Sequence, residues 1–281
     1  QMCIRDRDKY MDYLEENSKI FSFQITIDGV EDIHNERKPH YRNKDSFAKI
    51  TSNVDSLLKL GISVSIRINT DPYTMERADE LLDYFKEKGW LQYQNFKAYY
   101  ALLRKEVPIK GENGEYSKEM FTQSSFFCTY LQKGLEKQGC GKVMCQDYSV
   151  RSVLTNMLLG KSTPYKSHFC GAQSGMIIFD PLGDIYSCWD VVGQREYRVG
   201  HYMPDFVLED TFADKWFDSR VSKFSCIKCK YVLFCGGGCL ANAIRTTGNL
   251  QSGTCNDYSR LFNAEIKYIY NEKIKKGIDE N

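Results

Sequence analysis

CIKCKYVLFCGGGC, residues 226–239, places four cysteines within fourteen residues, with three consecutive glycines between the last two. Cys226 and Cys229 have two residues between them, a spacing at which two thiolates can face one metal. The glycines allow the backbone to approach an inorganic core that side chains would block. This stretch therefore predicts a metal centre that organises the surrounding chain.

Further cysteines flank this stretch on both sides. With Cys170, Cys188 and Cys255, seven thiols lie between residues 170 and 255. Zinc and iron–sulfur clusters each use four such ligands, so seven indicate two centres with an eighth ligand missing or not cysteine. The spacing favours iron–sulfur over zinc.

Composition excludes several classes of protein. The chain has 281 residues, with 38 basic and 37 acidic side chains, a balance that argues against nucleic acid or a membrane surface as partner. No apolar run reaches membrane-spanning length, and residues 1–7 lack the apolar core of a signal peptide. A cytoplasmic location is expected, where eleven cysteines indicate metal, redox pairs or nucleophiles rather than disulfides.

The front half alternates strands with helices. Apolar residues recur with period two over 20–27 and 62–69, and a weaker strand is expected over 95–103. Helical spacing follows over 46–61 and 74–89, each ending in glycine. Strands about every 35 residues are typical of βα units, so a parallel sheet is expected.

Two of these strands carry a polar face, although buried parallel strands are usually apolar on both faces. We interpret this face as the lining of a barrel that holds a polar ligand, with a water-exposed sheet edge as the alternative. The polar side chains are Ser22, Gln24, Thr26 and Asp28 on the first strand and Ser63, Ser65, Arg67 and Asn69 on the second.

Shorter elements are expected in the back half. Asp180-Pro-Leu-Gly183 suits a type I turn, so a hairpin is predicted around it. Helices are predicted over 210–224 and 257–276. Cys128 is interpreted as a core residue, and Cys140 and Cys145 as structural thiols or a second-site pair.

The cysteine spacing resembles the SPASM domain of radical SAM enzymes, which carries auxiliary [4Fe–4S] clusters. Cys170 is followed by twelve residues, Gly183, four residues and Cys188; the stretch 226–239 and then Cys255 complete the pattern. FSFQITIDGVEDIHNERKPH and GISVSIRINTD resemble the fourth and fifth barrel strands of the same enzymes. The resemblance covers about residues 20–260.

The resemblance implies an α/β fold, the C-terminal part of a partial (βα)6 TIM-like barrel followed by a cysteine-rich SPASM domain. The implied limits are a doubtful leading segment 1–7, the partial barrel 8–110, a helical linker 111–165, the SPASM domain 166–260 and a C-terminal helix 261–281.

The resemblance also implies ligand sets. One cluster takes Cys226, Cys229, Cys235 and Cys255; the other takes Cys170, Cys188 and Cys239 plus an upstream cysteine that this sequence lacks. His168 or an open iron site could stand in for that ligand. Thr26 and Asp28 match positions near S-adenosylmethionine, and Arg67 and Asn69 are plausible neighbours on the next strand.

The implied activity is maturation of a peptide or protein by hydrogen abstraction with a 5′-deoxyadenosyl radical, with a reductant such as ferredoxin or flavodoxin as partner. The Cys-x3-Cys-x2-Cys triplet of a third cluster is absent, so the chain resembles the C-terminal portion of such an enzyme and is expected to be inactive alone.

Other functions stay open. Anaerobic sulfatase maturases resemble the chain but place a catalytic aspartate directly after the second SPASM cysteine. Here Trp189 holds that place and Asp190, the candidate catalytic residue, follows. A non-catalytic iron–sulfur protein for binding or electron transfer and a structural zinc protein are the alternatives from other classes.

Overall fold

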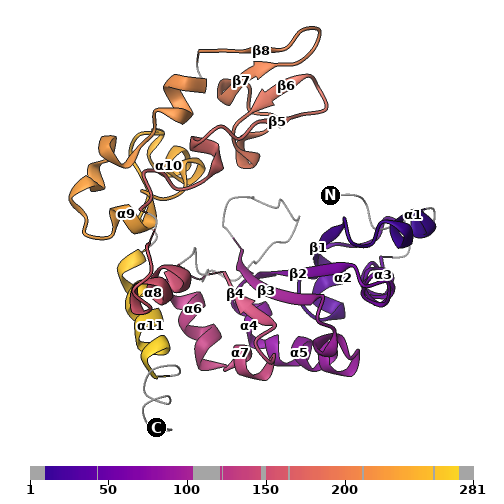
Figure 1. The fold of residues 1–281 in the computed structure, drawn as a ribbon. Helices are drawn as coiled ribbons and strands as arrows, with labels where there is room; N and C mark the ends of the chain where they lie inside the picture. The colour runs from indigo at the N-terminus through magenta and orange to yellow at the C-terminus, as the bar shows by residue number, and fades with distance from the viewer. Residues whose placement is uncertain are drawn as a thin grey trace. The chain divides into compact units, whose positions relative to one another are not determined.

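The computed structural model describes residues 10–42, 44–103, 121, 123–146, 150–163, 165–210, 212–255 and 257–271. The chain divides into two compact units, residues 1–147 and 148–281. Figure 1 shows the elements of each. Among the described residues, no helix is both long and apolar enough to cross a membrane.

The front unit is built on a parallel sheet in the order β1-β2-β3-β4, which confirms the α/β prediction (Figure 1). Its strands are β1 (Ser22–Thr26), β2 (Ser63–Thr70), β3 (Phe96–Leu102) and β4 (Val143–Cys145), and its helices are α1 (Met11–Glu16), α2 (Glu31–Arg37), α3 (Phe47–Lys59), α4 (Pro72–Glu76), α5 (Ala78–Glu87), α6 (Gln123–Gln132) and α7 (Leu135–Gln138).

The helices between the strands follow the expected pattern with one difference. Helix α3 ends before Gly61, whose φ of 75° is the left-handed conformation that favours glycine. The single helix predicted over 74–89 is instead two helices, because α4 ends at Glu76 and α5 begins at Ala78, with Arg77 as the cap between them. Asp71 caps α4 by accepting the Thr74 backbone N–H, and Pro72 occupies its first turn.

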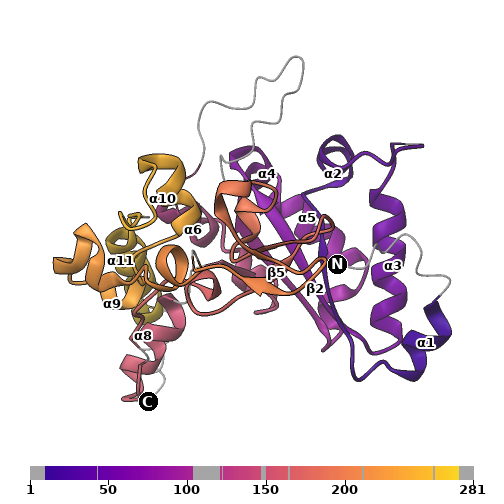
Figure 2. The same ribbon diagram turned by 90° about the horizontal axis from the view of Figure 1, so that it is seen from above.

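The two faces of the sheet differ as the alternation of residues requires. Ile25, Ile66, Ile68 and Tyr100 are buried on the face that packs against helices, which lie on one side of the sheet in Figures 1 and 2. The polar side chains lie on the opposite face, where the register pairs Gln24 with Ser65 and Thr26 with Arg67. The predicted polar face is therefore shared by neighbouring strands.

Strand β4 was not foreseen, because its segment was expected to be helical. It is only three residues long and pairs in parallel with β3. Helices α6 and α7 precede it, and the Tyr130 hydroxyl donates to the Val143 carbonyl at 2.8 Å. A three-residue strand has too little periodicity to be recognised in a sequence.

The back unit contains a small antiparallel sheet in the order β5-β6-β7-β8. Its elements are α8 (Val150–Leu158), β5 (Ile178–Phe179), β6 (Asp184–Tyr186), β7 (Arg198–His201), β8 (Val207–Leu208), α9 (Val232–Cys235), α10 (Leu240–Thr247) and α11 (Tyr258–Ile269). The predicted hairpin is confirmed, and the Asp180 carboxylate accepts from the backbone N–H groups of Leu182 and Asp184.

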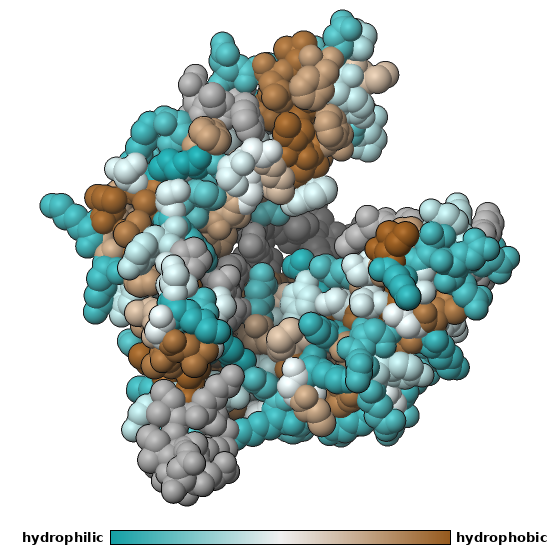
Figure 3. Space-filling view, viewed as in Figure 1, coloured by the Kyte–Doolittle hydropathy of each residue, from teal (hydrophilic) through white to brown (hydrophobic). Residues whose placement is uncertain are grey.

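The helix predicted over 210–224 is wrong as a single element. The structure has a π-helical turn, Phe212–Phe217, and a separate 3-10 turn, Val221–Lys223. Trp216 is fully buried in the core of this unit, as the sequence suggested. The sheet also exposes apolar side chains, visible as brown atoms over β7 and β8 in Figure 3; Phe179, Leu182, Met203 and Phe206 are more than half exposed.

Candidate functional site

The glycines between Cys235 and Cys239 adopt a conformation that other residues rarely accept. Gly236, Gly237 and Gly238 have φ values of 72°, 85° and 83°. A Cβ on Gly236 would lie closer than 3.0 Å to the backbone of His168, and one on Gly238 would do the same at Thr254. The glycine run thus brings the chain against the His168 and Thr254 loops. The approach of this backbone to an inorganic core stays a prediction.

Thr254 fastens the glycine loop to the segment that carries Cys255. Its backbone N–H donates to the Gly237 carbonyl at 2.8 Å, and its hydroxyl donates to the Cys239 carbonyl at 2.7 Å. Each bond contributes about 0.5–1.5 kcal/mol to stability. The two bonds fix Cys239 relative to Cys255, although sixteen positions separate them in the sequence.

One group of thiols forms around Cys188. Burial, together with the negative charges of Asp190, Cys239 and Cys170, raises the pKa of Cys188 to about 12. Cys239 is itself buried and is the residue before α10. Cys170, Cys188 and Cys239 therefore lie near one another, on three separate elements of the back unit.

A second group forms around Cys226 and Cys235. Burial raises the pKa of both thiols, and in both cases the fields of Cys229 and Cys255 act in the same direction. Cys229 and Cys255 are exposed, whereas Cys226 and Cys235 are half-buried. Cys188 thus has Cys170 and Cys239 as electrostatic neighbours, whereas Cys226 and Cys235 have Cys229 and Cys255. The assignment of these seven cysteines to two ligand sets stays a prediction.

Backbone amides point at the sulfur atoms in both groups. The Gly237 N–H donates to Cys235 Sγ at 3.3 Å, the Gln173 N–H donates to the side chain of Cys170, and an N–H at Asp190 lowers the pKa of Cys188 against the effect of burial. Such donors stabilise negative charge on thiolates and are typical of metal-bound sulfur. The donor set therefore suits metal-bound thiolates.

Gln173 orients the loop that carries Cys170. Its side chain is fully buried, its Oε1 accepts from the backbone N–H of Phe169 at 2.9 Å, and its Nε2 donates to the Ser219 carbonyl at 2.6 Å. Sequence reasoning missed this residue, since an isolated glutamine carries no spacing signal. Within the described residues, no three His, Cys, Asp or Glu side chains gather tightly enough to hold a single metal ion.

The candidate catalytic residue lies beside the first group. Asp190 is half-buried in a 3-10 turn, Trp189–Val191, and its carbonyl accepts from Arg245 at 3.2 Å, while the Trp189 side chain is 70% exposed. His168 is half-buried, and its Nδ1 lies 3.0 Å from the Ser167 hydroxyl. The catalytic role of Asp190 and the ligand role of His168 stay predictions.

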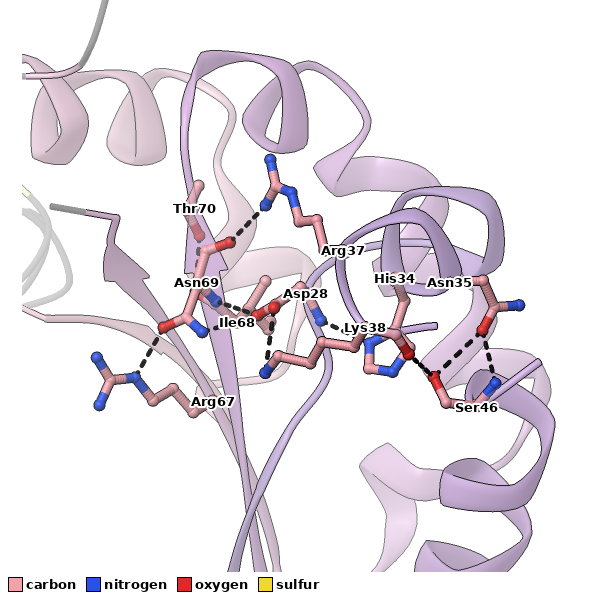
Figure 4. Close-up of polar contacts among 10 residues, drawn as sticks. All are labelled: Asp28, His34, Asn35, Arg37, Lys38, Ser46, Arg67, Ile68, Asn69 and Thr70. Atoms are coloured by element: carbon pink, nitrogen blue, oxygen red, sulfur yellow. Dashed lines mark hydrogen bonds and ion pairs between the residues drawn. The ribbon is translucent and has the colours of Figure 1, made fainter. Parts of the chain in front are cut away.

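In the front unit, the predicted polar residues meet at the carboxyl ends of β1 and β2 (Figure 4). The Asp28 carboxylate accepts from the Asn69 side-chain amide at 2.8 Å and pairs with Lys38 at 3.2 Å. Asn69 Oδ1 in turn accepts from Arg67 Nε at 2.9 Å. Asp28 is 4% exposed, so its carboxylate is engaged within this network and holds the side chains of Asn69 and Lys38 in place.

Further charged residues extend the network. Arg37 donates to the Asn69 carbonyl at 3.2 Å and to the Asp71 carboxylate at 2.6 Å. Burial acts to raise the pKa of Asp71, but the Thr74 backbone N–H and Arg37 outweigh it, so that the pKa lies below its usual value. The resemblance includes the stretch DGVEDIHNERK but assigns no role to Arg37 or Lys38.

His34 supports the turn beneath this network. Its Nδ1 accepts the Asp28 backbone N–H at 3.0 Å, so the neutral ring carries its proton on Nε2. The side chain is fully buried, and desolvation lowers its pKa to about 4. Nε2 has no hydrogen-bond partner among the described residues. A histidine in a helical stretch gives no sequence signal for this contact.

Comparisons with known proteins agree with the resemblance. A serine-type anaerobic sulfatase-maturating enzyme of Bacteroides thetaiotaomicron is 22% identical over 285 residues, covering 93% of this chain and 66% of that protein. A cysteine-type anaerobic sulfatase-maturating enzyme of Clostridium perfringens is 24% identical, covering 81% of this chain and 60% of that protein. The chain thus spans less than two thirds of the length of each of these relatives, and no family model matches it.

Solved structures with this fold include anSMEcpe with bound AdoMet, with a TM-score of 0.61 and 19% identity over 97% of this chain and 69% of that chain. SuiB of Streptococcus suis bound to S-adenosylmethionine has a TM-score of 0.54 and 12% identity, over 89% of this chain and 61% of that chain. The resemblance drawn from the cysteine spacing is confirmed: the relatives of this chain are anaerobic sulfatase-maturating enzymes, and its fold is shared with anSMEcpe and SuiB.

Proposed function

We propose that the chain is part of a radical SAM enzyme that modifies a peptide or protein, with two [4Fe–4S] clusters in its SPASM domain. The observation that carries this proposal is the division of seven cysteines into two groups with amide donors at the sulfurs. The relatives support it, and one solved neighbour holds both AdoMet and a Kp18Cys peptide.

The proposed domain limits are the partial barrel over 8–110, a linker over 111–165, the SPASM domain over 166–260 and a C-terminal helix over 261–281. The parallel order of β1 to β4 supports a barrel segment, since consecutive parallel strands joined by helices are its repeating unit. The division of the chain into two compact units falls between residues 147 and 148, within the proposed linker.

Each side chain has a task in this proposal. Cys226, Cys229, Cys235 and Cys255 hold one cluster. Cys170, Cys188 and Cys239 hold the other, whose remaining position takes His168 or a substrate group. When bound, S-adenosylmethionine and its own cluster supply a 5′-deoxyadenosyl radical that abstracts hydrogen from the substrate.

The barrel residues bind and orient the cofactor. Thr26 and Arg67 line the polar face in register, and Asp28 and Asn69 hold Arg67 in place through the contacts in Figure 4. Asp190, beside the first thiol group, would take a proton from a substrate near that cluster. A reductant such as ferredoxin or flavodoxin in the cytoplasm is the proposed electron source.

Metal analysis tests the proposal. After anaerobic reconstitution, the chain should hold about eight irons and as much acid-labile sulfide, the content of two four-iron clusters. Cys170→Ala and Cys229→Ala should each lower this to about four. Tightly bound zinc without sulfide would contradict the proposal, and so would the loss of both clusters from either variant while the protein stays folded.

Sulfatase maturation is the second candidate, because the relatives carry that name. The displacement of Asp190 by one position from the aspartate of those enzymes argues against it. The full-length enzyme, incubated with S-adenosylmethionine and a sulfatase-derived peptide containing cysteine or serine, would convert that residue to formylglycine. Mass spectrometry would show the conversion, and an unchanged peptide would exclude this candidate.

A further inference from the structure

Strand β8 is an edge of the small antiparallel sheet, because it pairs with β7 and with no other described strand. The Glu209 N–H donates to the Val199 carbonyl at 2.9 Å, and the Val207 carbonyl faces β7, where a Cβ on Gly200 would lie closer than 3.0 Å to it. Backbone groups of successive residues point to opposite sides of a strand, so the N–H and C=O of Leu208 point outward. The edge therefore offers a backbone donor and acceptor to an added strand.

Exposed apolar side chains lie near this edge on a fixed support. The ring centroid of Phe179 is 5.1 Å from that of Tyr202 and 6.4 Å from that of Phe206. Tyr202 fastens the two turns of the sheet together, because its backbone N–H donates to the Gly183 carbonyl at 2.8 Å and its hydroxyl donates to the Asp180 carbonyl at 2.6 Å. A surface held in this way loses little freedom when a partner binds. The exposed apolar residues are Phe179, Leu182, Met203, Phe206, Val207 and Leu208, and Figure 3 shows brown atoms over this part of the sheet.

The same sheet carries excess negative charge. Arg198 is shared between two carboxylates, Asp184 at 3.2 Å and Glu209 at 2.7 Å. Asp205, in the turn before β8, is exposed and forms no ion pair with another described residue. An apolar edge with this charge complements an extended peptide that carries cations, and proteins bind such peptides by adding them to a free sheet edge. The charged residues of segments 178–186 and 198–210 are Asp180, Asp184, Asp205, Glu209 and Asp210 against Arg198.

We propose that β8 takes an extended segment of the peptide substrate as an additional strand, a segment with apolar side chains at alternate positions and lysine or arginine beside them. This inference rests on the proposed function in one respect, that the substrate is a peptide. Leu208 forms the backbone bonds, Phe179 and Phe206 contact the apolar side chains, and Asp205 attracts the cation. Strand β6 of the same sheet ends two residues before Cys188, so the docked segment is bound by the unit that carries the proposed clusters. The docking residues themselves are separate from those assigned to the clusters or to S-adenosylmethionine.

Binding of short peptides to the reconstituted 281-residue chain tests the strand addition. The probe is fluorescein-labelled Gly-Lys-Val-Thr-Val-Thr-Val-Lys-Gly, followed by fluorescence anisotropy, and its counterparts carry glutamate in place of lysine or serine in place of valine. The lysine peptide should bind about two- to fivefold more tightly than the glutamate peptide, and the serine peptide should not bind measurably. High salt should narrow the difference between lysine and glutamate, because Asp205 is exposed.

Methylation of the probe's backbone nitrogens separates strand addition from simple apolar adhesion. One derivative is methylated at two of the valine nitrogens and the other at the two threonine nitrogens. In an added strand the N–H groups of alternate residues face β8. One derivative should therefore lose affinity about tenfold or more, and the other about twofold or less.

Substitutions in the chain locate the binding site. Phe206→Ser should weaken binding of the lysine peptide by about fivefold or more, because it removes an apolar contact. Asp205→Asn should bring the affinities of the lysine and glutamate peptides closer together, because it removes the unpaired charge. Ile20→Ser is the matched control, since Ile20 is a 77% exposed apolar residue of the front unit. Circular dichroism and thermal unfolding of each variant show whether it is folded.

Four results would overturn the inference. Equal effects of the two methylation patterns would exclude an added strand, and an effect of Ile20→Ser as large as that of Phe206→Ser would exclude this edge. Self-association of the chain that Phe206→Ser abolishes, without peptide binding, would assign the edge to a second copy. Binding by the chain but not by the full-length enzyme would assign it to another segment of the same protein. Iron content and peptide binding are measured on one sample, so a failure of this inference is distinguishable from a failure of the proposed function.

Discussion

Gly238→Ala should separate the two cysteine-bearing loops that meet at Thr254. Gly238 has a φ of 83°, and a Cβ there would lie closer than 3.0 Å to the Thr254 carbonyl oxygen, which is backbone and cannot rotate away. Gly248→Ala is the matched control, since Gly248 has a φ of 70° but nothing within 4 Å of an added Cβ. Both variants share the conformational cost, and only Gly238→Ala adds the collision.

The magnitudes follow from these contacts. An alanine in the left-handed region costs about 1–2 kcal/mol, which is the whole effect expected for Gly248→Ala. In Gly238→Ala the Thr254 segment must move away, which breaks its bonds to Gly237 and Cys239 at about 0.5–1.5 kcal/mol each. The sum for Gly238→Ala is about 2–5 kcal/mol.

Urea unfolding and iron analysis check both consequences. Gly238→Ala should unfold at a clearly lower urea concentration than Gly248→Ala and, after anaerobic reconstitution, should hold less iron because Cys239 and Cys255 are displaced. Gly248→Ala should retain the iron of the unsubstituted chain. Equal stability and equal iron content in the two variants would show that the approach of Gly238 to Thr254 does not position the cysteines.

Three further changes test individual contacts. In Gln173→Leu the site that contains Cys170 should lose its iron while the site that contains Cys229 keeps it, because Gln173 orients only the Cys170 loop. Loss of all the iron would contradict this local role of Gln173. Asp71→Ala should destabilise the chain by about 1–3 kcal/mol in urea unfolding, because it removes the α4 cap and the ion pair with Arg37. The control, Asp83→Ala, removes only an exposed pair with Lys86 and should cost under about 1 kcal/mol. Similar losses in the two variants would refute the role of Asp71 as cap and ion-pair partner. His34 has a folded pKa of about 4 against an ordinary 6.5, so as the pH falls the unfolded chain binds the proton first, and the stability present above pH 6.5 is lost toward pH 4. This loss of unfolding free energy, about 3 kcal/mol, should be missing in His34→Gln. Parallel curves of stability against pH for the two proteins would show that His34 is not held neutral.

The regular elements of the front unit were predictable because their signals are local. Alternation in 62–69 and helical spacing in 46–61 match β2 and α3 closely, since each strand or helix buries one face against the same core. Where a signal was short or interrupted, prediction failed. The three residues of β4 and the break at Arg77 depend on contacts with β3 and on the cap at Asp71, which lie outside any short window.

In the candidate site, too, some features were predictable from the sequence and others were not. Cysteine spacing predicted seven metal ligands, because a metal centre would restrict ligand type and separation along the chain. It could not reveal that Gln173, Thr254 and the Gly237 amide hold those thiols in place, since their partners are distant in sequence. His34, Arg37 and Lys38 were missed in the front unit for the same reason.

By itself, the sequence determined which residues can carry the chemistry: seven cysteines at fixed spacing, a glycine run between two of them, and a polar face on two strands. Only the tertiary structure decided how they are used. It divided the thiols into two groups, engaged Asp28 in contacts with Lys38 and Asn69, and left the outer nitrogens of Arg67 directed away from the network. The physical reason is that residue type and spacing act along the chain, whereas burial, hydrogen bonding and charge pairing depend on which distant segments meet.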